Sequence, residues 1–328
     1  YAMTTMAKRN NAERMQMLYD YGASVNINLQ SPIFKERFCL NAVQFLLEKG
    51  KLPSEGELYE AVEMQDYTMV ELLLKYKAKV TAEVMRIAIK GDLKIVKLLL
   101  DHTEDGKFPC NTFSDGDRPF AYIQELVGEE NYPVLEFIFK DLEAGGKLFY
   151  NDLSNCQYDE KSMWNCLDFT IKMLMEDCIE NANLKSTELI LNYIKKKETI
   201  EEICLSKEYI CKGLLNNSKN IETLNAMVKL LKENGLFKKL EKELVETVCK
   251  EYSSQELEAL EVNLDDKVMS IAIVALNVDI IGYMVRNGIK PDQKNCNLAL
   301  NTLSLLSPNT DKNEEYEKCI KIIELFLK

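Results

Sequence analysis

The stretch MRIAIKGDLKIVKLLL, residues 85–100, consists of two short apolar segments separated by Gly91-Asp92. Within each segment the apolar residues recur three or four positions apart, which is the spacing of one face of a helix. Glycine interrupts a helical pattern, and aspartate is a favourable residue at a helix N-cap. The stretch therefore predicts a short helix, a tight turn and a second, more apolar helix.

The same plan recurs along the chain, which indicates an internal repeat. A shift of 26 residues places Val70 of QDYTMVELLLKYKAKV under Val96, and it places Asp66 under Asp92. The stretch VMSIAIVALNVDIIGYMV, residues 268–285, repeats the plan near the other end. Nine units are predicted, with second helices anchored at Met15, Val43, Val70, Val96, Leu135, Thr187, Leu224 or Val228, Ile281 and Ile323.

The size of the unit determines the fold class that we expect. A helix pair this short cannot bury both of its apolar faces alone, so neighbouring pairs must stack on it. We therefore expect an all-α fold, an α-solenoid of stacked helix-turn-helix repeats that is irregular in the middle. The expected parts are regular repeats in 1–100, irregular repeats with loop insertions (102–119 and 143–162) in 101–180, and divergent repeats in 181–328.

Three segments carry a resemblance to a known family. GDLKIVKLLLDH, NAERMQMLYDYGASVN and NAVQFLLEKG resemble the second-helix half of the ankyrin repeat. No unit has the Thr-Pro-Leu-His opening of that repeat, and the N-terminal anchors are 26 to 28 residues apart, against about 33 in ankyrin repeats. The resemblance thus implies short, divergent ankyrin-like repeats that lack the projecting hairpin fingers and that act in protein–protein interaction.

Composition restricts the partners and the compartment. The chain has 41 basic and 53 acidic residues among 328, a formal net charge of -12, which argues against binding to a phosphate backbone. No apolar run approaches the roughly 18 to 20 residues that span a bilayer, and no charged start followed by a short apolar core indicates a signal peptide. The ten cysteines are scattered and form no C-x-x-C pair, which predicts reduced thiols. We expect a cytoplasmic protein, or a secreted effector in a host cytosol.

The repeat interpretation places candidate binding residues on the first helices. We expect a non-enzymatic scaffold that binds a protein partner on the face of the stacked first helices and on the inserted loops. Both ends of the sequence fall within helical patterns, so we expect the scaffold to belong to a larger protein or complex. The candidate partner-binding residues, for each of which an ordinary solvated surface is the alternative, are Tyr59, Glu60, Glu63, Arg86, Lys90, Ser270 and Val274.

A second candidate surface is the acidic segment 241–266. It contains nine acidic and two basic residues. Such a charge run is typical of a solvated helix face. The alternative interpretation is a docking patch for a basic partner.

An enzyme is the alternative function. Its catalytic insertion would lie in 101–180 and would use His102, the only histidine of the chain, with Cys110 or the nearby Asp115 and Asp117. Cysteine–histidine catalysis requires such a histidine as the base. Phosphate-binding glycine loops and zinc-ligand spacings are missing from the sequence, so we expect no cofactor and no metal. The favoured prediction is that this sequence contains no catalytic residue.

Overall fold

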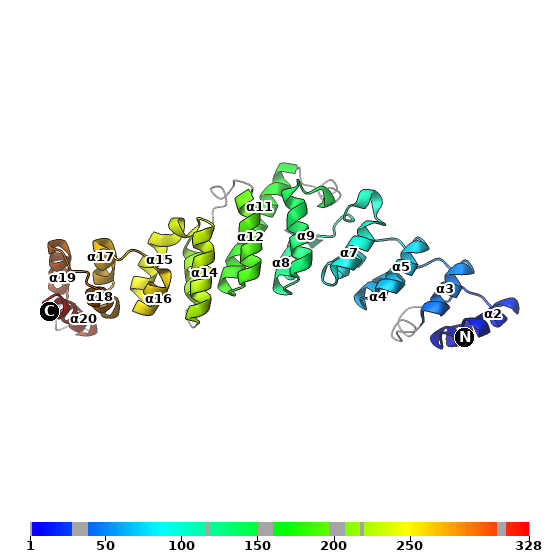
Figure 1. The fold of residues 1–328 in the computed structure, drawn as a ribbon, viewed down its shortest axis with the longest axis horizontal. Coiled ribbons are helices and arrows are strands. Elements are labelled where there is room, and N and C mark those ends of the chain that lie inside the picture. The colour runs from blue at the N-terminus through cyan, green and yellow to red at the C-terminus, as the bar shows by residue number, and fades with distance from the viewer. Residues whose placement is uncertain are drawn as a thin grey trace. The chain divides into compact units, whose positions relative to one another are not determined.

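The chain folds almost entirely into α-helices, which confirms the expected all-α class (Figure 1). The computed structural model describes residues 2–27, 39–115, 118–149, 160–196, 207–216, 220–306 and 313–327. Within these ranges the strands are β1 (Ser114–Asp115) and β2 (Arg118–Pro119), which form one short antiparallel pair. Residues 1–171 and 172–328 form two compact units, called unit 1 and unit 2 below. The expected division into three parts stays a prediction.

Unit 1 is built from short helices that follow one another in pairs. The first helix α4 contacts its partner α5 and also α6 of the following pair, and α5 contacts α7. The helices of unit 1 are α1 (Ala2–Lys8), α2 (Ala12–Asp20), α3 (Leu40–Glu48), α4 (Glu55–Glu63), α5 (Tyr67–Lys75), α6 (Ala82–Ile89), α7 (Leu93–Leu100), α8 (Ala121–Gly128) and α9 (Tyr132–Glu143), with the 3-10 turns η1 (Glu104–Gly106) and η2 (Lys147–Phe149).

Unit 2 follows the same contact pattern, and most of its helices are longer than those of unit 1. The first helices α13, α15, α17 and α19 contact one another in sequence, and so do the second helices α14, α16, α18 and α20. The boundary with unit 1 falls within α11 (Glu160–Glu180). The remaining helices are α12 (Leu184–Lys196), α13 (Lys207–Asn216), α14 (Ile221–Glu233), α15 (Phe237–Glu251), α16 (Ser254–Leu260), α17 (Asp266–Val274), α18 (Val278–Arg286), α19 (Gln293–Leu305) and α20 (Asn313–Phe326).

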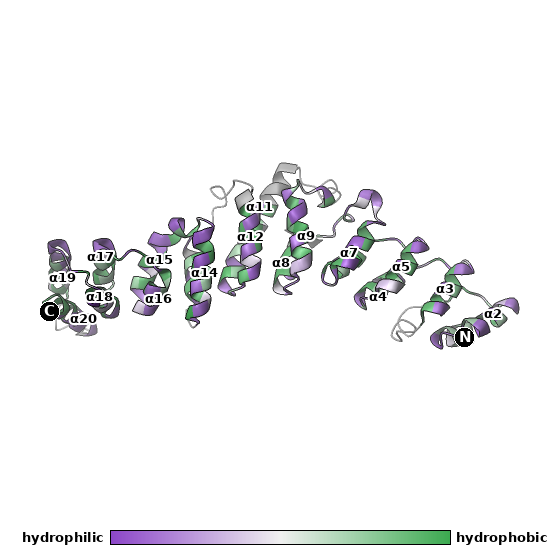
Figure 2. Cartoon of the chain, viewed as in Figure 1, coloured by the Kyte–Doolittle hydropathy of each residue, from purple (hydrophilic) through white to green (hydrophobic). Residues whose placement is uncertain are grey.

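The anchor residues of the nine predicted units all lie in helices. Each helix carries both hydrophobic and hydrophilic residues (Figure 2), and every anchor except Thr187 is hydrophobic. Ile323 of α20 is half-buried while its neighbour Ile322 is fully buried, so the apolar stripe of that helix is shifted by one residue. The anchors with fully buried side chains are Met15, Val43, Val70, Val96, Leu135, Thr187, Leu224 and Ile281.

A tenth helix pair, α15–α16, is absent from the nine predicted units. It occupies the position between α13–α14 and α17–α18, because α15 contacts α13 and α17 while α16 contacts α14 and α18. Helix α16 has only seven residues, too short to display an apolar period. Its start is nevertheless marked in the sequence, because Ser253 and Glu256 form a capping box.

Five of the turns between the two helices of a pair share one backbone conformation. The residue before the N-cap position has a positive φ at Asn10, Gln65, Glu130, Ala182 and Leu276. These five side chains have little in common, so the conformation is set by the turn and by the asparagine or aspartate that follows. That following residue is Asn11, Asp66, Asn131, Asn183 or Asn277.

Two of these asparagines also join neighbouring pairs. The Asn131 side-chain amide donates to the carbonyl oxygens of Ile89 and Gly91, each at 2.9 Å. In unit 2 the Asn277 amide donates to the carbonyl oxygens of Cys249 and Tyr252, at 3.1 and 2.8 Å. In both cases the turn of one pair is bonded to the end of the first helix of the preceding pair.

Among the described residues, none of the helices combines the length and the apolar content that crossing a bilayer requires. The expected insertion at 143–162 falls partly outside these residues. Its described portions comprise the end of α9, the turn η2 and the start of α11.

Candidate interaction surface

The predicted site residues of unit 1 lie on the first helices α4 and α6. On α4, Tyr59 and Glu60 are half-buried and Glu63 is exposed. Helix α4 is fixed at its start by a buried ion pair, in which Lys51 Nζ lies 2.6 Å from Glu57 Oε1 with both side chains almost fully buried. The second oxygen of Glu57 accepts from the Ser54 backbone N–H, so the buried carboxylate is satisfied on both sides.

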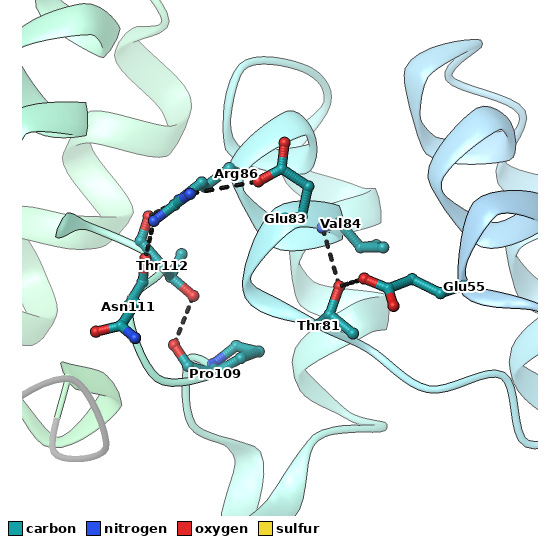
Figure 3. Close-up of polar contacts among 8 residues, drawn as sticks. All are labelled: Glu55, Thr81, Glu83, Val84, Arg86, Pro109, Asn111 and Thr112. Atoms are coloured by element: carbon teal, nitrogen blue, oxygen red, sulfur yellow. Dashed lines mark hydrogen bonds and ion pairs between the residues drawn. The ribbon is translucent and has the colours of Figure 1, made fainter. Parts of the chain in front are cut away.

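Arg86 of α6 binds the inserted loop. Its guanidinium donates to the carbonyl oxygens of Asn111 and Thr112, and its other edge lies 3.3 Å from the Glu83 carboxylate (Figure 3). The Thr112 hydroxyl in turn donates to the Pro109 carbonyl oxygen at 2.6 Å. Arg86 therefore anchors the insertion to the first-helix face.

The insertion has a small core of its own. Phe108 and Phe113 are buried and pack edge to face, with ring centroids 4.8 Å apart. The Phe108 backbone N–H donates to the Leu148 carbonyl oxygen, which ties the loop to the turn η2. The described part of the predicted insertion is thus a packed segment with a defined conformation.

Lys90, the C-cap residue of α6, is bound to the following first helix, α8. Its Nζ lies 2.5 Å from Glu125 and 3.7 Å from Glu129. The hydrogen bond to Glu125, supported by the charges of both glutamates, raises the pKa of Lys90 above its ordinary value of 10.5 although partial burial acts in the opposite direction. Lys90 is therefore held charged and in place at neutral pH.

Tyr122 of α8 lies between the two cations and was not among the predicted site residues. The Arg86 guanidinium is 4.8 Å and the Lys90 ammonium 5.9 Å from the centre of its ring, both within the range of cation–π contact. The repeat alignment could have predicted the contact between Lys90 and Glu129, because it places residues of opposite charge at the same position of two successive repeats. The offset of 39 residues that carries Val96 to Leu135 also carries Lys90 to Glu129.

Ser270 and Val274 lie on α17, in unit 2. The Ser270 hydroxyl oxygen lies 2.8 Å from both the Asn295 side-chain oxygen and the Asp266 carbonyl oxygen, and its single proton is donated to one of these two acceptors. Val274 is 66% exposed. The structure thus brings Arg86 and Lys90 together, and it places Ser270 and Val274 in the other compact unit.

The acidic segment 241–266 covers most of α15, all of α16 and the start of α17. Part of its charge is neutralised locally, because Glu246 lies 3.8 Å from Lys242 and Glu261 lies 2.9 Å from Lys232. The ion pair with Lys232 lowers the pKa of Glu261, which keeps this exposed carboxylate ionised. Docking of a basic partner on this segment stays a prediction.

The residues of the enzyme alternative are only partly brought together. His102 and Cys110 line one groove, which is described further below. The His102 Nδ1 atom lies 2.9 Å from the Leu98 carbonyl oxygen, so this nitrogen carries the proton. The side chains of Asp115 and Asp117 lie outside the described residues. In the described ranges no group of three or more histidine, cysteine, aspartate or glutamate side chains is positioned to hold a metal ion.

The cysteines pack as core residues. Seven described cysteines are free thiols, and five of them are buried. Burial, reinforced by nearby carboxylates, raises the pKa of Cys178, Cys211 and Cys249 to about 12. These thiols stay protonated and unreactive at neutral pH.

No protein-family model matches the chain, and a search of the curated proteins finds no significant match.

Proposed function

We propose that the chain is a non-enzymatic scaffold that binds a protein partner across the first helices α4, α6 and α8. We further propose that its helix pairs form a divergent ankyrin-like solenoid. The buried anchors, the contacts between successive first helices and between successive second helices, and the shared turn conformation all support a repeated unit. The net charge of -12 favours a protein over a nucleic acid as the partner.

One observation carries the proposal. Arg86, Lys90, Tyr122, Glu125 and Glu129 form a network that joins two successive first helices and holds their long side chains in place. Side chains that are ordered before binding lose less conformational entropy when a partner arrives. The network thus presents a preorganised polar and aromatic face, flanked on α4 by Tyr59 and the exposed Glu63.

The scaffold is tested by comparing two charge reversals within one helix pair. Glu63→Lys alters the first-helix face on α4, and Glu71→Lys makes the same charge change at an exposed position of the second helix α5. Tagged wild type and both variants are used for affinity purification with quantitative mass spectrometry, after circular dichroism has shown equal helix content. We expect the partners of the wild type to be retained by Glu71→Lys and lost with Glu63→Lys. Equal recovery with both variants would contradict the proposed face.

The enzyme alternative has one observation in its favour, the shared groove of His102 and Cys110. Replacement of both residues, His102→Gln with Cys110→Ser, distinguishes it from the scaffold. The scaffold requires that this double variant keep the partners and the cellular effect of the wild type. A loss of the effect with retained partners would favour catalysis. The free, protonated thiols support placing the protein in the cytoplasm.

A further inference from the structure

An open groove of about 630 Å³ lies in unit 1 between the turn after α5 and the loop after α7. It is separate from the network around Tyr122. Its apolar lining includes Leu74, Val80 and Pro109, and its charged lining is mostly basic. The polar and charged residues that line it and are used below are Lys77, Lys79, His102, Glu104, Lys107 and Cys110.

Lys77 occupies a position that glycine fills in five other turns. The turns after α2, α3, α9, α14 and α18 have a positive φ at Gly22, Gly50, Gly145, Gly235 and Gly288. In each of them this glycine N–H and the next N–H donate back to the end of the preceding helix, and the N–H groups of Lys77 and Ala78 make the same two bonds. Lys77 adopts this conformation with a φ of 65°.

A side chain at this position carries a backbone cost. An added Cβ at each of the five glycines would meet no atom within 4 Å, so space does not require glycine there. The left-handed backbone does favour it, because a non-glycine residue is strained in that region. The strained backbone at Lys77 places an ammonium group at the groove, where glycine would place none.

The groove is a local concentration of positive charge in an acidic protein. Lys75, Lys77 and Lys79 are the only charged residues between Glu71 and Glu83. Lys77 and Lys79 are exposed, and within the described residues neither side chain has an ion-pair partner. Lys107 on the opposite wall is 3.7 Å from Asp105, and Glu104 is the only acidic residue of the lining.

The wall that carries Pro109 and Cys110 is held rigidly. Arg86 binds the carbonyl oxygens of Asn111 and Thr112, and the Thr112 hydroxyl binds that of Pro109 (Figure 3). The loop is fixed from its other side by the buried Phe108. The groove therefore exists before a ligand arrives, which lowers the entropic cost of binding.

We propose that this groove binds an acidic peptide segment of a protein partner. The two free ammonium groups recognise carboxylates, and Leu74, Val80 and Pro109 contact the intervening apolar side chains. A groove of about 630 Å³ that combines apolar residues with lysines matches a peptide better than a compact inorganic anion. This inference rests on the proposed function as a protein scaffold, and it assigns the chemistry of one partner segment.

The test uses a fluorescein-labelled peptide that alternates aspartate and alanine, and fluorescence anisotropy at low salt. The control peptide has asparagine in place of aspartate. The protein variants are Lys77→Gly, Lys79→Ala, their combination, and Lys75→Ala as a matched control. Lys75 is exposed and belongs to the same turn region, but it does not line the groove.

We expect the acidic peptide to bind and the asparagine peptide to bind at least about tenfold more weakly. Lys77→Gly should weaken binding about threefold, and the combination with Lys79→Ala about tenfold, which is the usual size of exposed ion-pair effects. Lys77→Gly should at the same time raise the melting temperature by roughly 2 °C, because it removes the strained backbone. If Lys77 serves binding, Lys77→Gly lowers the affinity for the peptide and raises the melting temperature. If Lys77 serves only the structure, the affinity does not change.

Three results would overturn the proposal. The first is equal binding of the acidic and the asparagine peptide. The second is a loss of affinity with Lys75→Ala as large as that with Lys77→Gly. The third is displacement of the peptide by inorganic phosphate at the same concentration of negative charge, which would make the groove a phosphate site. Glu63→Lys serves as the link to the scaffold face. It should leave the affinity for the peptide unchanged, so a failure of the groove and a failure of the first-helix face give different results.

Discussion

The turns at Asn131 in unit 1 and at Asn277 in unit 2 are both bonded to the preceding helix pair, but they differ in how the following helix is capped. Both asparagine amides donate to two carbonyl oxygens of the preceding pair. Asn277 also caps its own helix by accepting from the Ile280 N–H, whereas Asn131 makes no such cap. Helix α9 has Pro133 in its first turn, which removes one N–H that a cap could bind. The bridge between pairs is therefore retained where the cap is not.

The turns of the regular block make the same connection with different atoms. The Asp92 N–H donates to the Gln65 side-chain oxygen at 2.8 Å, and the Ala42 N–H donates to the Asn10 side-chain oxygen at 2.9 Å. In these turns the side chain of the earlier pair accepts, while at Asn131 and Asn277 the side chain of the later pair donates. Neighbouring pairs are joined through backbone groups in both arrangements.

The largest expected effect concerns the thiol beside the Asn277 bridge. Cys249 is buried with its pKa raised to about 12, so only about one thiol in ten thousand is ionised at pH 8. We expect iodoacetamide to modify Cys249 at least about a hundredfold more slowly than the half-exposed Cys296, as measured by mass spectrometry. Asn277→Ala should accelerate the modification of Cys249 selectively. Equal rates at both cysteines in the wild type would show that this part of unit 2 is not packed as described.

The bridge itself is tested by removing the two asparagines. Asn277→Ala should lower the free energy of unfolding by about 3 kcal/mol, because two hydrogen bonds and a cap are lost. Asn131→Ala should cost about 2 kcal/mol, since it loses the bridge alone. Asn220→Ala, which removes only a cap at the start of α14, is the control and should cost about 1 kcal/mol. Urea unfolding followed by circular dichroism measures all three, and equal losses for the three variants would exclude a role for the bridge.

Gly91 offers a test of the hydrogen bond between Gln65 and Asp92 in the regular block. A Cβ at this position would lie 2.1 to 2.3 Å from the Gln65 amide, so Gly91→Ala must displace the side chain that accepts from Asp92. We expect a loss of about 1 to 2 kcal/mol, the value of the broken hydrogen bond and the lost packing. Gly128→Ala is the matched control. It meets no atom within 4 Å at the end of α8 and should stabilise the protein by about 0.5 to 1 kcal/mol. Stabilisation by both variants would contradict the close approach at Gly91.

The smallest expected effect is the pH dependence of the Lys90–Glu125 pair. The pKa of Lys90 is raised in the folded state. The stabilisation is therefore fully present below the unfolded value of about 10.5 and is lost as the pH rises through the higher folded value. Because both side chains are partly exposed, we expect less than about 0.5 kcal/mol. A double-mutant cycle of Lys90→Met and Glu125→Gln at pH 8 and pH 11.5 measures it, and a coupling that persists at pH 11.5 would contradict the assignment.

The sequence predicted the helical class and the buried anchors because both depend on apolar periodicity. Val96 and Ile281, in different units, were aligned by this signal alone and are both fully buried. Two helices were predicted in residues 236–266, but they were not counted as a repeat because α16 spans only two turns of helix. Helix length, rather than divergence of the residues, limited the prediction there.

The candidate site was less accessible to prediction. Arg86 and Lys90 were selected as surface residues, but their partners Thr112 and Glu125 are 26 and 35 residues away along the chain. The positive φ of Lys77 could not be predicted from the residue itself, because lysine does not favour a left-handed backbone. In the structure, Lys77 takes the place that Gly22 has in the turn after α2. Contacts between distant turns depend on how the pairs stack, and periodicity does not encode them.

The asparagine bridges have a consequence for how such a chain changes over generations. Asn131 and Asn277 bind main-chain oxygens, which every amino acid supplies. A helix pair can therefore replace nearly all of its side chains and still accept the next pair, provided that the path of its backbone is kept. We therefore expect helix pairs joined in this manner to tolerate side-chain substitutions as long as the backbone at the junction is kept.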